Sequence, residues 1–291
     1  MTFGCIDIGS NTTRLLVAEV DDGRLREVLS RRVFTRIGAS VSASGEIPPE
    51  KVAETTEATK ALADEARELG ASQIGVVGTA AVRHASNREQ LERSVLVTTG
   101  LRLRVLSGTE EAELSFAGAC HALEHVRGRL AVVDVGGGST EIAVGQAHRA
   151  PEWSESLRVG SSLLCERHLH SDPPAAREID AACAEVYELL AGVEPPAADS
   201  AVAVGGTATS LTGLVGGRLT QESLRSGLAR LCTLSAQQTA RELVLPLERA
   251  RLLPGGIAVL AGIAAWLGCA LQIVSGGVRE GTVLQMAGAG A

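Results

Sequence analysis

Short apolar runs alternate with longer amphipathic stretches along most of this chain. Apolar runs that end in Gly, Ser, Thr or Asp are typical of buried strands. Stretches with apolar residues at every third or fourth position are typical of helices that pack on a sheet. Strands that alternate with helices predict an α/β layer structure.

The predicted elements repeat one plan in the two halves of the chain. The first half predicts strands within 1–37, helices at 50–69 and 88–97, strands at 74–77 and 101–106, and a helix from the capping-box pattern at Ser107 toward Leu123. The second half predicts strands at 130–135, 201–204 and 271–274, and helices at 161–168, 175–190 and from 278 onward. The most apolar stretch, 255–268, is too short to span a bilayer and predicts a buried core helix.

One short phrase occurs in both halves. It reads Ile6-Asp7-Ile8-Gly9-Ser10-Asn11-Thr12 near the start and Val133-Asp134-Val135-Gly136-Gly137-Gly138-Ser139-Thr140 near the middle. A hairpin with such a bend can turn backbone N–H groups and hydroxyls toward an anion, although one copy alone would also fit an ordinary turn. Two copies with matched flanks predict two phosphate-binding loops. Neither is a Walker A loop, and neither has the spacing of a dinucleotide-binding motif.

Asp7 and Asp134 occupy equivalent positions in the two copies. Halves that fold face to face would bring both carboxylates to one cleft, which suits Mg²⁺ because this ion prefers one or two carboxylates with waters and phosphate oxygens. The alternative is that each aspartate only caps its own turn.

Four further charged residues lie next to the predicted loops and strand ends. Glu111 lies in the first turn of a helix, where the helix dipole alone favours an acidic residue. Glu141 follows the second loop and is also compatible with an ordinary strand position. Arg83 follows a buried strand and Arg14 follows the first loop, so both are either solvated charges or ligands of phosphate oxygens.

Composition limits the class of ligand. A chain of 291 residues with 45% hydrophobic and 21% charged residues fits two soluble globular domains. An aromatic content of 2% argues against nucleic-acid binding through base stacking. The net charge of −7 argues against a general polyanion-binding surface, so a phosphate-rich ligand requires a local basic cluster.

The cysteines and the N-terminus indicate a cytoplasmic protein. The six cysteines are scattered, with no C-x-x-C pair and no zinc-ligand spacing, which favours reduced thiols. The N-terminus leads directly into a strand and shows no signal-peptide pattern. We expect no membrane and no nucleic acid as partners.

Six ordered motifs carry a resemblance to a known family. They are Asp7-Ile-Gly-Ser-Asn-Thr, Gly78-Thr79 with Arg83, Ser107-Gly-Thr-Glu-Glu-Ala112, Val133-Asp-Val-Gly-Gly-Gly-Ser-Thr-Glu141, Val204-Gly-Gly-Thr-Ala-Thr209 and Ser275-Gly-Gly-Val-Arg-Glu-Gly281. In this order the chain resembles the exopolyphosphatase and guanosine-pentaphosphate phosphohydrolase family, which belongs to the sugar-kinase, heat-shock-chaperone and actin superfamily.

The resemblance implies a fold of two actin-like (ribonuclease H-like) domains with a cleft between them. We place the first at 1–115 and the second at 116–291. We expect no additional C-terminal helical domain of the kind that longer members carry. The resemblance also implies a homodimer.

The resemblance assigns roles to the candidate residues. Glu111 matches the general base and Arg83 the arginine that grips substrate phosphate. The matching metal ligands, for Mg²⁺ or Mn²⁺, are Asp7, Asp134 and Glu141. The expected phosphate-binding residues are Gly9, Ser10, Asn11, Thr12, Arg14, Gly136, Gly137, Gly138, Ser139, Thr140, Gly206 and Thr207. Position 14 varies in the family, so the role of Arg14 rests on its place after the first loop.

The implied activity is that of an exopolyphosphatase. Such an enzyme hydrolyses the terminal phosphoanhydride of linear inorganic polyphosphate and releases orthophosphate by metal-assisted in-line attack of water. We expect short chains to be its substrates. Guanosine pentaphosphate 5′-phosphohydrolase is the alternative within the enzyme class, because both substrates present a terminal anhydride. ATP phosphotransfer is possible for the superfamily, and a non-catalytic sensor of phosphate-rich ligands is the alternative of another class.

Overall fold

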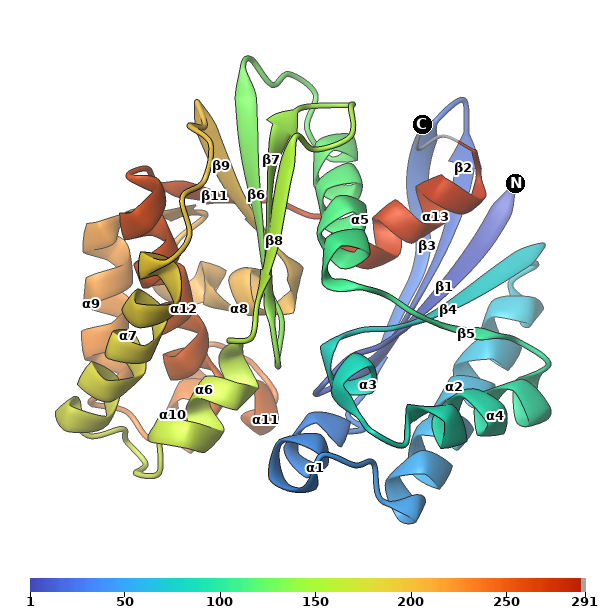
Figure 1. Cartoon of the computed structure of the whole chain (residues 1–291), viewed down its shortest axis with the longest axis horizontal. Helices are drawn as coiled ribbons and strands as arrows, with labels where there is room; N and C mark the ends of the chain where they lie inside the picture. The colour runs from blue at the N-terminus through green and yellow to red at the C-terminus, as the bar shows by residue number, and fades with distance from the viewer. Residues whose placement is uncertain (289–291) are drawn as a thin grey trace. The chain divides into compact units, whose positions relative to one another are not determined.

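The computed structural model describes residues 1–288 and contains two compact units (Figure 1). Unit 1 comprises residues 1–124, 148–150 and the chain from 276 onward, and unit 2 comprises 125–147 and 151–275. The predicted division at 115 differs from these units in three respects: unit 1 extends to 124, it includes residues 148–150, and it contains the closing helix. Residues 289–291 of the predicted second half lie outside the described residues.

Unit 1 is built on a five-stranded sheet with the order β3-β2-β1-β4-β5. β1, β2 and β3 are antiparallel neighbours, whereas β4 and β5 continue the sheet parallel to β1. The strands are β1 (Thr2–Ile8), β2 (Thr13–Asp21), β3 (Arg24–Val33), β4 (Gln73–Gly78) and β5 (Leu103–Val105). The helices are α1 (Ile37–Ser44), α2 (Pro49–Glu68), α3 (Ala80–His84), α4 (Arg88–Thr99), α5 (Gly108–His121) and α13 (Val278–Met286).

Helices cover both faces of this sheet (Figure 1). Ile6 and Ile8 of β1 pack with residues of α1, α2 and α4, whereas Phe3 and Cys5 pack with residues of α5 and α13. The alternation along β1 therefore supplies apolar side chains to two separate cores. α13 joins unit 1 because its apolar face fills the second of these cores.

Unit 2 is built on a six-stranded sheet with the order β10-β11-β9-β6-β7-β8. The strands are β6 (Arg129–Val135), β7 (Thr140–Gln146), β8 (Trp153–Leu157), β9 (Ser200–Val204), β10 (Arg218–Leu219) and β11 (Leu271–Ile273). The helices are α6 (Ser161–His168), α7 (Ala176–Ala191), α8 (Gly205–Val215), α9 (Gln221–Leu231), α10 (Ala236–Glu242), α11 (Leu247–Ala250) and α12 (Leu253–Leu267).

The core of unit 2 confirms the predicted buried helix. α12 packs together with α7, α8 and α9 against inward residues of β6 such as Val133 and Val135. Within the described residues, only the segment Leu247–Leu267 has the length and composition of a membrane-spanning helix, and 67% of its most apolar window is buried. This burial fits a core helix.

One exposed residue of unit 2 has a strained backbone. Val244 follows α10 with φ 52°, and the N–H of Leu245 donates to the carbonyl of Ala240 at 2.9 Å, which is a helix-ending geometry that favours glycine. The valine side chain is 89% exposed and loses almost no burial when it is removed.

We expect Val244→Gly to raise the free energy of unfolding by about 0.5–1 kcal/mol, because a β-branched residue is strained at positive φ. Val97 is a matched control, since it is 80% exposed but lies within α4. Val97→Gly should lower the free energy of unfolding by a few tenths to about 1 kcal/mol. Urea denaturation measures both changes, and destabilisation by Val244→Gly would contradict the assigned strain.

Candidate active site

The two predicted loops have the same backbone geometry. In unit 1 the N–H of Gly9 donates to the carbonyl of Thr12 at 3.0 Å, and in unit 2 the N–H of Gly136 donates to the carbonyl of Ser139 at 2.9 Å. Each loop joins two antiparallel strands, β1 with β2 and β6 with β7. The predicted hairpin with a widened bend is thus confirmed in both copies.

In unit 1 the carbonyls of the loop are turned toward the start of α1. The carbonyl of Ser10 accepts from the N–H of Gly38 at 2.7 Å, and the carbonyl of Asn11 accepts from the N–H of Arg36 at 3.1 Å. In a trans peptide the N–H points opposite to the carbonyl. The N–H groups of Asn11 and Thr12 therefore point away from α1, where they are available to an anion.

Unit 2 repeats this arrangement with α6. The carbonyl of Gly136 accepts from the N–H of Ser161 at 2.9 Å, and the carbonyl of Gly137 accepts from the N–H groups of Ser162 at 2.9 Å and Leu163 at 3.0 Å. The N–H groups of Gly137 and Gly138 consequently point away from α6. In both units the start of a helix holds the loop carbonyls and leaves the loop N–H groups for a ligand.

The loop side chains divide into available and engaged groups. The Nδ2 atom of Asn11 is buried and has no hydrogen-bond partner among the described residues. The side chains of Ser10 and Ser139 are also buried. Thr140 differs from the prediction, because its hydroxyl is fully buried and donates to the carbonyl of Val159 at 2.6 Å. The hydroxyl of Thr140 therefore links the hairpin to the segment before α6 and is not available to donate to phosphate.

Gly205, Gly206 and Thr207 form the first turn of α8 rather than a loop after a strand. Gly205 has φ 83°, and a Cβ atom there would lie 2.3 Å from Oδ1 of Asp134. Only glycine therefore lets the Asp134 carboxylate approach this turn. The N-terminus of α8 carries the N–H groups and the dipole that favour an anion.

Sequence reasoning missed two residues of unit 2. Arg249 is buried in α11, and its guanidinium atoms lie 3.0–3.4 Å from the Cβ position of Gly206. The hydroxyl of Ser162 is buried without a hydrogen-bond partner among the described residues. Neither residue carries a local signal, because Arg249 lies in an arginine-rich segment and Ser162 in an ordinary first helical turn.

The two aspartates face different residues across their hairpins. Asp134 lies directly opposite Glu141, whereas Asp7 lies directly opposite Arg14. Glu141 is buried and accepts from the hydroxyl of Ser156 at 2.8 Å. The same hairpin position thus supplies a second carboxylate in unit 2 and a cation in unit 1.

Arg14 lies within a cluster of cations in unit 1. Burial, followed by the positive charges of Arg279 and Arg32, lowers the pKa of Arg14 to about 9, so its guanidinium still carries a charge at neutral pH. Its Nε atom is buried and has no hydrogen-bond partner among residues 1–288. Arg279 donates to the carbonyl of Leu15 at 3.3 Å, which fixes the cluster against β2.

The structure distinguishes the two glutamates at the start of α5. Glu110 completes a capping box with Ser107, and its side chain pairs with Arg104 at 2.7 Å. Arg104, together with hydrogen bonds from Ser107, lowers the pKa of Glu110 to about 2. Glu111 is only 6% exposed and lies 2.7 Å from Nη1 of Arg83. Glu110 therefore stabilises the start of the helix, whereas Glu111 is buried in contact with a cation.

Arg83 is fixed by two further contacts in unit 1. Its Nη1 atom donates to the carbonyl of Leu106 at 3.0 Å, and its backbone N–H donates to the carbonyl of Thr79 at 2.9 Å. Thr79 lies beside the first loop, because its hydroxyl is 3.8 Å from the Cβ position of Gly9. Arg83 and Glu111, for which the sequence predicted separate roles, are thus in contact with each other near the first loop.

The carboxylates suit a metal that is completed by other ligands. No group of three or more His, Cys, Asp or Glu side chains in the described part of the chain is arranged to hold a metal ion. The opposed pair of Asp134 and Glu141 supplies two carboxylates at one end of a hairpin, which is the number that Mg²⁺ takes when waters and phosphate oxygens complete its shell. Asp7 fits less well alone, because a cation lies opposite it.

The relatives of this chain carry phosphatase names. The model of the Ppx/GppA phosphatase family matches residues 16–289. Exopolyphosphatase 2 of Mycobacterium tuberculosis is 36% identical over 222 residues, which cover 72% of this chain and 69% of that protein.

Solved structures agree with the family match. An exopolyphosphatase-like protein has a TM-score of 0.89 at 28% identity, with 98% of this chain and 97% of that chain covered. The Ppx/GppA family member from Aquifex aeolicus has a TM-score of 0.83 at 26% identity, with 99% of this chain and 97% of that chain covered. The chain therefore belongs to the Ppx/GppA phosphatase family and has the actin-like two-domain α/β fold of its members.

Proposed function

We propose that this protein is an exopolyphosphatase that removes the terminal phosphate from short chains of inorganic polyphosphate. The family makes it a hydrolase of phosphoanhydride bonds, and its named exopolyphosphatase relatives favour polyphosphate as the substrate. The observation that carries the proposal is the pair of equivalent loops whose N–H groups point away from α1 and α6. Such N–H groups suit oxyanions, and a linear phosphate chain presents several identical oxyanions.

Unit 1 supplies the group that activates water. Glu111 is the general base, and its buried carboxylate accepts a proton from the attacking water. Arg83 keeps that carboxylate oriented through their 2.7 Å contact and stabilises negative charge on the transferred phosphoryl group. The N–H groups of Asn11 and Thr12 bind phosphate oxygens, and the cation of Arg14 adds attraction for the anion.

Unit 2 supplies the second phosphate cradle. The N–H groups of Gly137 and Gly138 and the first turn of α8 bind phosphate oxygens. Arg249 supports this turn from beneath Gly206. Asp134 and Glu141 would hold Mg²⁺ or Mn²⁺, and Asp7 is the further predicted ligand. When bound, such an ion neutralises charge on phosphate oxygens and orients them for in-line attack.

We expect Asp134→Asn to raise the Mg²⁺ concentration for half-maximal phosphate release at least about 10-fold, because it removes one of two opposed carboxylates. Asp7→Asn should raise the required Mg²⁺ concentration less, because the positive charge of Arg14, which lies opposite Asp7, already repels a metal ion there. Titration of Mg²⁺ against phosphate release measures both. Equal metal requirements in wild type and Asp134→Asn would contradict the assignment, as would full activity in excess chelator.

Two alternatives differ from the proposal in testable ways. A guanosine pentaphosphate 5′-phosphohydrolase would use the same groups on a terminal anhydride attached to a nucleoside. A non-catalytic sensor would need no general base, and the buried pair of Arg83 and Glu111 therefore argues against it. Phosphate release with polyphosphate, guanosine pentaphosphate and ATP, each with Mg²⁺, tests all three. No release from polyphosphate would refute the proposal.

Chain length is a separate expectation. Because the protein has a net charge of −7, a long polyphosphate tail beyond the local cations is repelled rather than bound. We expect kcat/KM per chain end to stop rising after a few phosphate units, with only modest weakening by salt. Phosphate release from chains of a few, some tens and several hundred units measures this dependence. Efficiency that rises up to the longest chain would contradict it.

A cytoplasmic location, a homodimer and the absence of nucleic-acid or membrane partners stay predictions from the sequence. They do not bear on the chemistry proposed for the loops. Size-exclusion chromatography with light scattering would measure the oligomeric state.

A further inference from the structure

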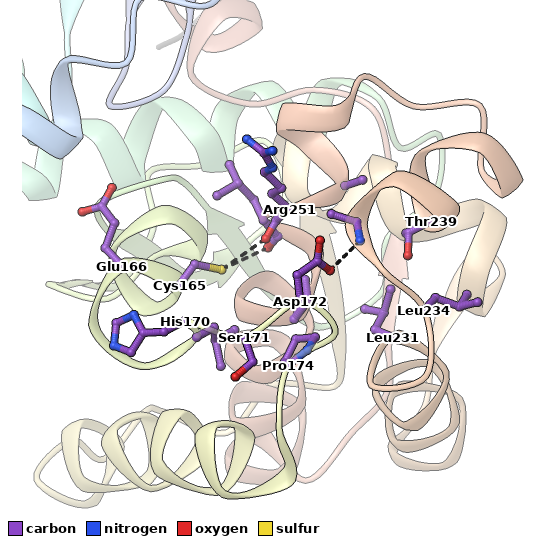
Figure 2. Close-up of a pocket in the computed structure, with 15 residues that line it drawn as sticks. Cys165, Glu166, His170, Ser171, Asp172, Pro174, Leu231, Leu234, Thr239 and Arg251 are labelled. Carbon is purple, nitrogen blue, oxygen red and sulfur yellow. Dashed lines mark hydrogen bonds between the residues drawn. The ribbon is translucent and has the colours of Figure 1, made fainter.

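A pocket of about 400 Å³ lies in unit 2 among the ends of several helices (Figure 2). Its walls come from the end of α6 with the loop that follows, the end of α9, α10, and the junction of α11 and α12. It shares no residue with the loops at Gly136–Ser139 and Gly205–Thr207. The proposed hydrolysis therefore assigns no role to this pocket.

One side of the pocket is apolar. Leu231 and Leu234 line it together with Thr239, and Figure 2 shows these three residues on the opposite side from Cys165 and Glu166. Thr239 is a buried residue, and its hydroxyl makes no hydrogen bond within the described part of the chain. A pocket with apolar walls and a few polar groups is the usual form of a small-molecule site.

Two opposite charges lie at the same pocket. Asp172 accepts from the N–H of Ala236 at 2.7 Å through Oδ1, which fixes its carboxylate at the start of α10. Arg251 makes no ion pair or side-chain hydrogen bond among residues 1–288. An ammonium group suits Asp172 and a carboxylate suits Arg251. The exposed side chains of Glu166 and His170 complete the polar rim.

The thiol in this pocket is not the reactive group. Burial raises the pKa of Cys165 to about 12, so the thiolate that reacts as a nucleophile is absent at neutral pH. Its sulfur lies 3.6 Å from the carbonyl of Arg251. Cys165 is therefore a packing residue, and the pocket suits reversible binding.

We propose that this pocket binds an α-amino acid with a large apolar side chain. The ammonium group contacts Asp172, the carboxylate contacts Arg251, and the apolar side chain lies against Leu231 and Leu234. An α-amino acid combines these three features in one small molecule. The volume of about 400 Å³ accommodates it together with water.

The walls of the pocket connect directly to the second phosphate loop. α6 begins with the N–H groups that hold the carbonyls of Gly136 and Gly137, and it ends at the pocket. A Cβ atom on Gly255 of α12 would lie 2.6 Å from the carbonyl of Ser161 and 2.7 Å from the sulfur of Cys165, so α6 and α12 are in close contact. Close-packed elements transmit small displacements. A ligand in the pocket should therefore change the position or mobility of the loop at Gly136–Ser139.

Three related ligands test the two charges separately on the full-length protein. They are L-phenylalanine, 2-phenylethylamine, which lacks the carboxylate, and 3-phenylpropionate, which lacks the ammonium group. Isothermal titration calorimetry should show that each of the last two binds about 10-fold more weakly than L-phenylalanine, because each loses one charge-assisted contact. Equal binding of all three would overturn the proposed charge recognition.

Two substitutions assign each charge to its residue. In Arg251→Gln, L-phenylalanine should bind about as weakly as 2-phenylethylamine, and in Asp172→Asn about as weakly as 3-phenylpropionate. Asparagine keeps an oxygen that can accept from Ala236, so α10 remains capped. Arg241→Gln is the control, since Arg241 is an exposed arginine of α10 outside the pocket, and it should bind like wild type. Equal loss in Arg241→Gln and Arg251→Gln would overturn the assignment.

Two further measurements locate the site and its effect without using catalysis. Ala236→Phe should fill the pocket and abolish binding of L-phenylalanine, and unchanged binding in this variant would place the ligand elsewhere. Hydrogen exchange should slow at the amides of Ser162 and Leu163 when L-phenylalanine binds, because these amides hold the loop. Unchanged exchange there would overturn the connection to the loop. Both outcomes are independent of the proposed exopolyphosphatase activity.

Discussion

Glu111→Gln is expected to lower kcat for phosphate release from polyphosphate by roughly 10²–10⁴-fold and to leave substrate binding largely unchanged. General-base catalysis contributes about this factor, and glutamine cannot accept the proton of the attacking water. The substitution keeps the shape of a side chain that is only 6% exposed. Its amide oxygen can still accept from Arg83, so the arginine stays in place. Steady-state kinetics, with binding measured separately by calorimetry, tests this expectation.

Glu110→Gln is the matched control for that experiment. The neighbouring glutamate lies on the same helical turn but is committed to Ser107 and Arg104. Its replacement should leave kcat near the wild-type value and cost at most about 1 kcal/mol of stability through the weakened capping box. Turnover close to wild type in Glu111→Gln, or a loss of the same size in Glu110→Gln, would show that the base has been assigned to the wrong residue.

Gly281→Ala is expected to lower the free energy of unfolding by about 3 kcal/mol. A Cβ atom at this position would lie 2.0 Å from the carbonyl oxygen of Leu114, so α13 and α5 would have to move apart. Both contact partners are helix backbone, which cannot rotate away as a side chain can. Overpacking of this kind typically costs about 1–3 kcal/mol and occasionally more. Denaturant unfolding followed by circular dichroism measures the change.

Gly213→Ala is the same substitution at another position, but it is expected to raise the free energy of unfolding. Gly213 lies inside α8, and a Cβ atom there would meet only Leu243, at an ordinary contact distance of 3.5 Å. This substitution should raise the free energy of unfolding by about 0.5–1 kcal/mol, since alanine loses less backbone entropy than glycine in a helix. Changes of the same sign in the two variants would contradict the close contact of α13 with α5.

The duplicated hairpin combines one backbone design with two kinds of chemistry. Both loops close with the same N–H to carbonyl bond, and both have their carbonyls held by the start of a following helix. The residue opposite the aspartate is Arg14 in unit 1 and Glu141 in unit 2. We infer that the loop backbone binds phosphate in both units. The residue opposite the aspartate differs in charge: Glu141 adds a carboxylate that attracts a metal ion, whereas Arg14 supplies a positive charge in place of a metal ion.

Much of the fold follows from local patterns in the sequence. The predicted helix at 161–168 agrees with α6, and the predicted helix at 50–69 agrees with α2 to within one residue at each end. The two loops were recognisable because their Gly and hydroxyl residues repeat between matched apolar runs. By contrast, α1 and α8 were missed, because both contain Gly and small polar residues that are typical of loops.

Only the tertiary structure separated residues that look alike in the sequence. Glu110 and Glu111 are adjacent, but Glu110 belongs to the capping box, whereas Glu111 is buried in contact with Arg83. Arg249 lies beside the first turn of α8 because α11 packs on Gly206, and no local sequence pattern predicts this contact. The sequence by itself therefore determined the two repeated hairpin loops and those strands and helices that have a clear apolar period, because these depend on local propensity and periodicity. Long-range packing decided which charged side chains are buried beside those loops, since burial depends on elements that lie far apart along the chain.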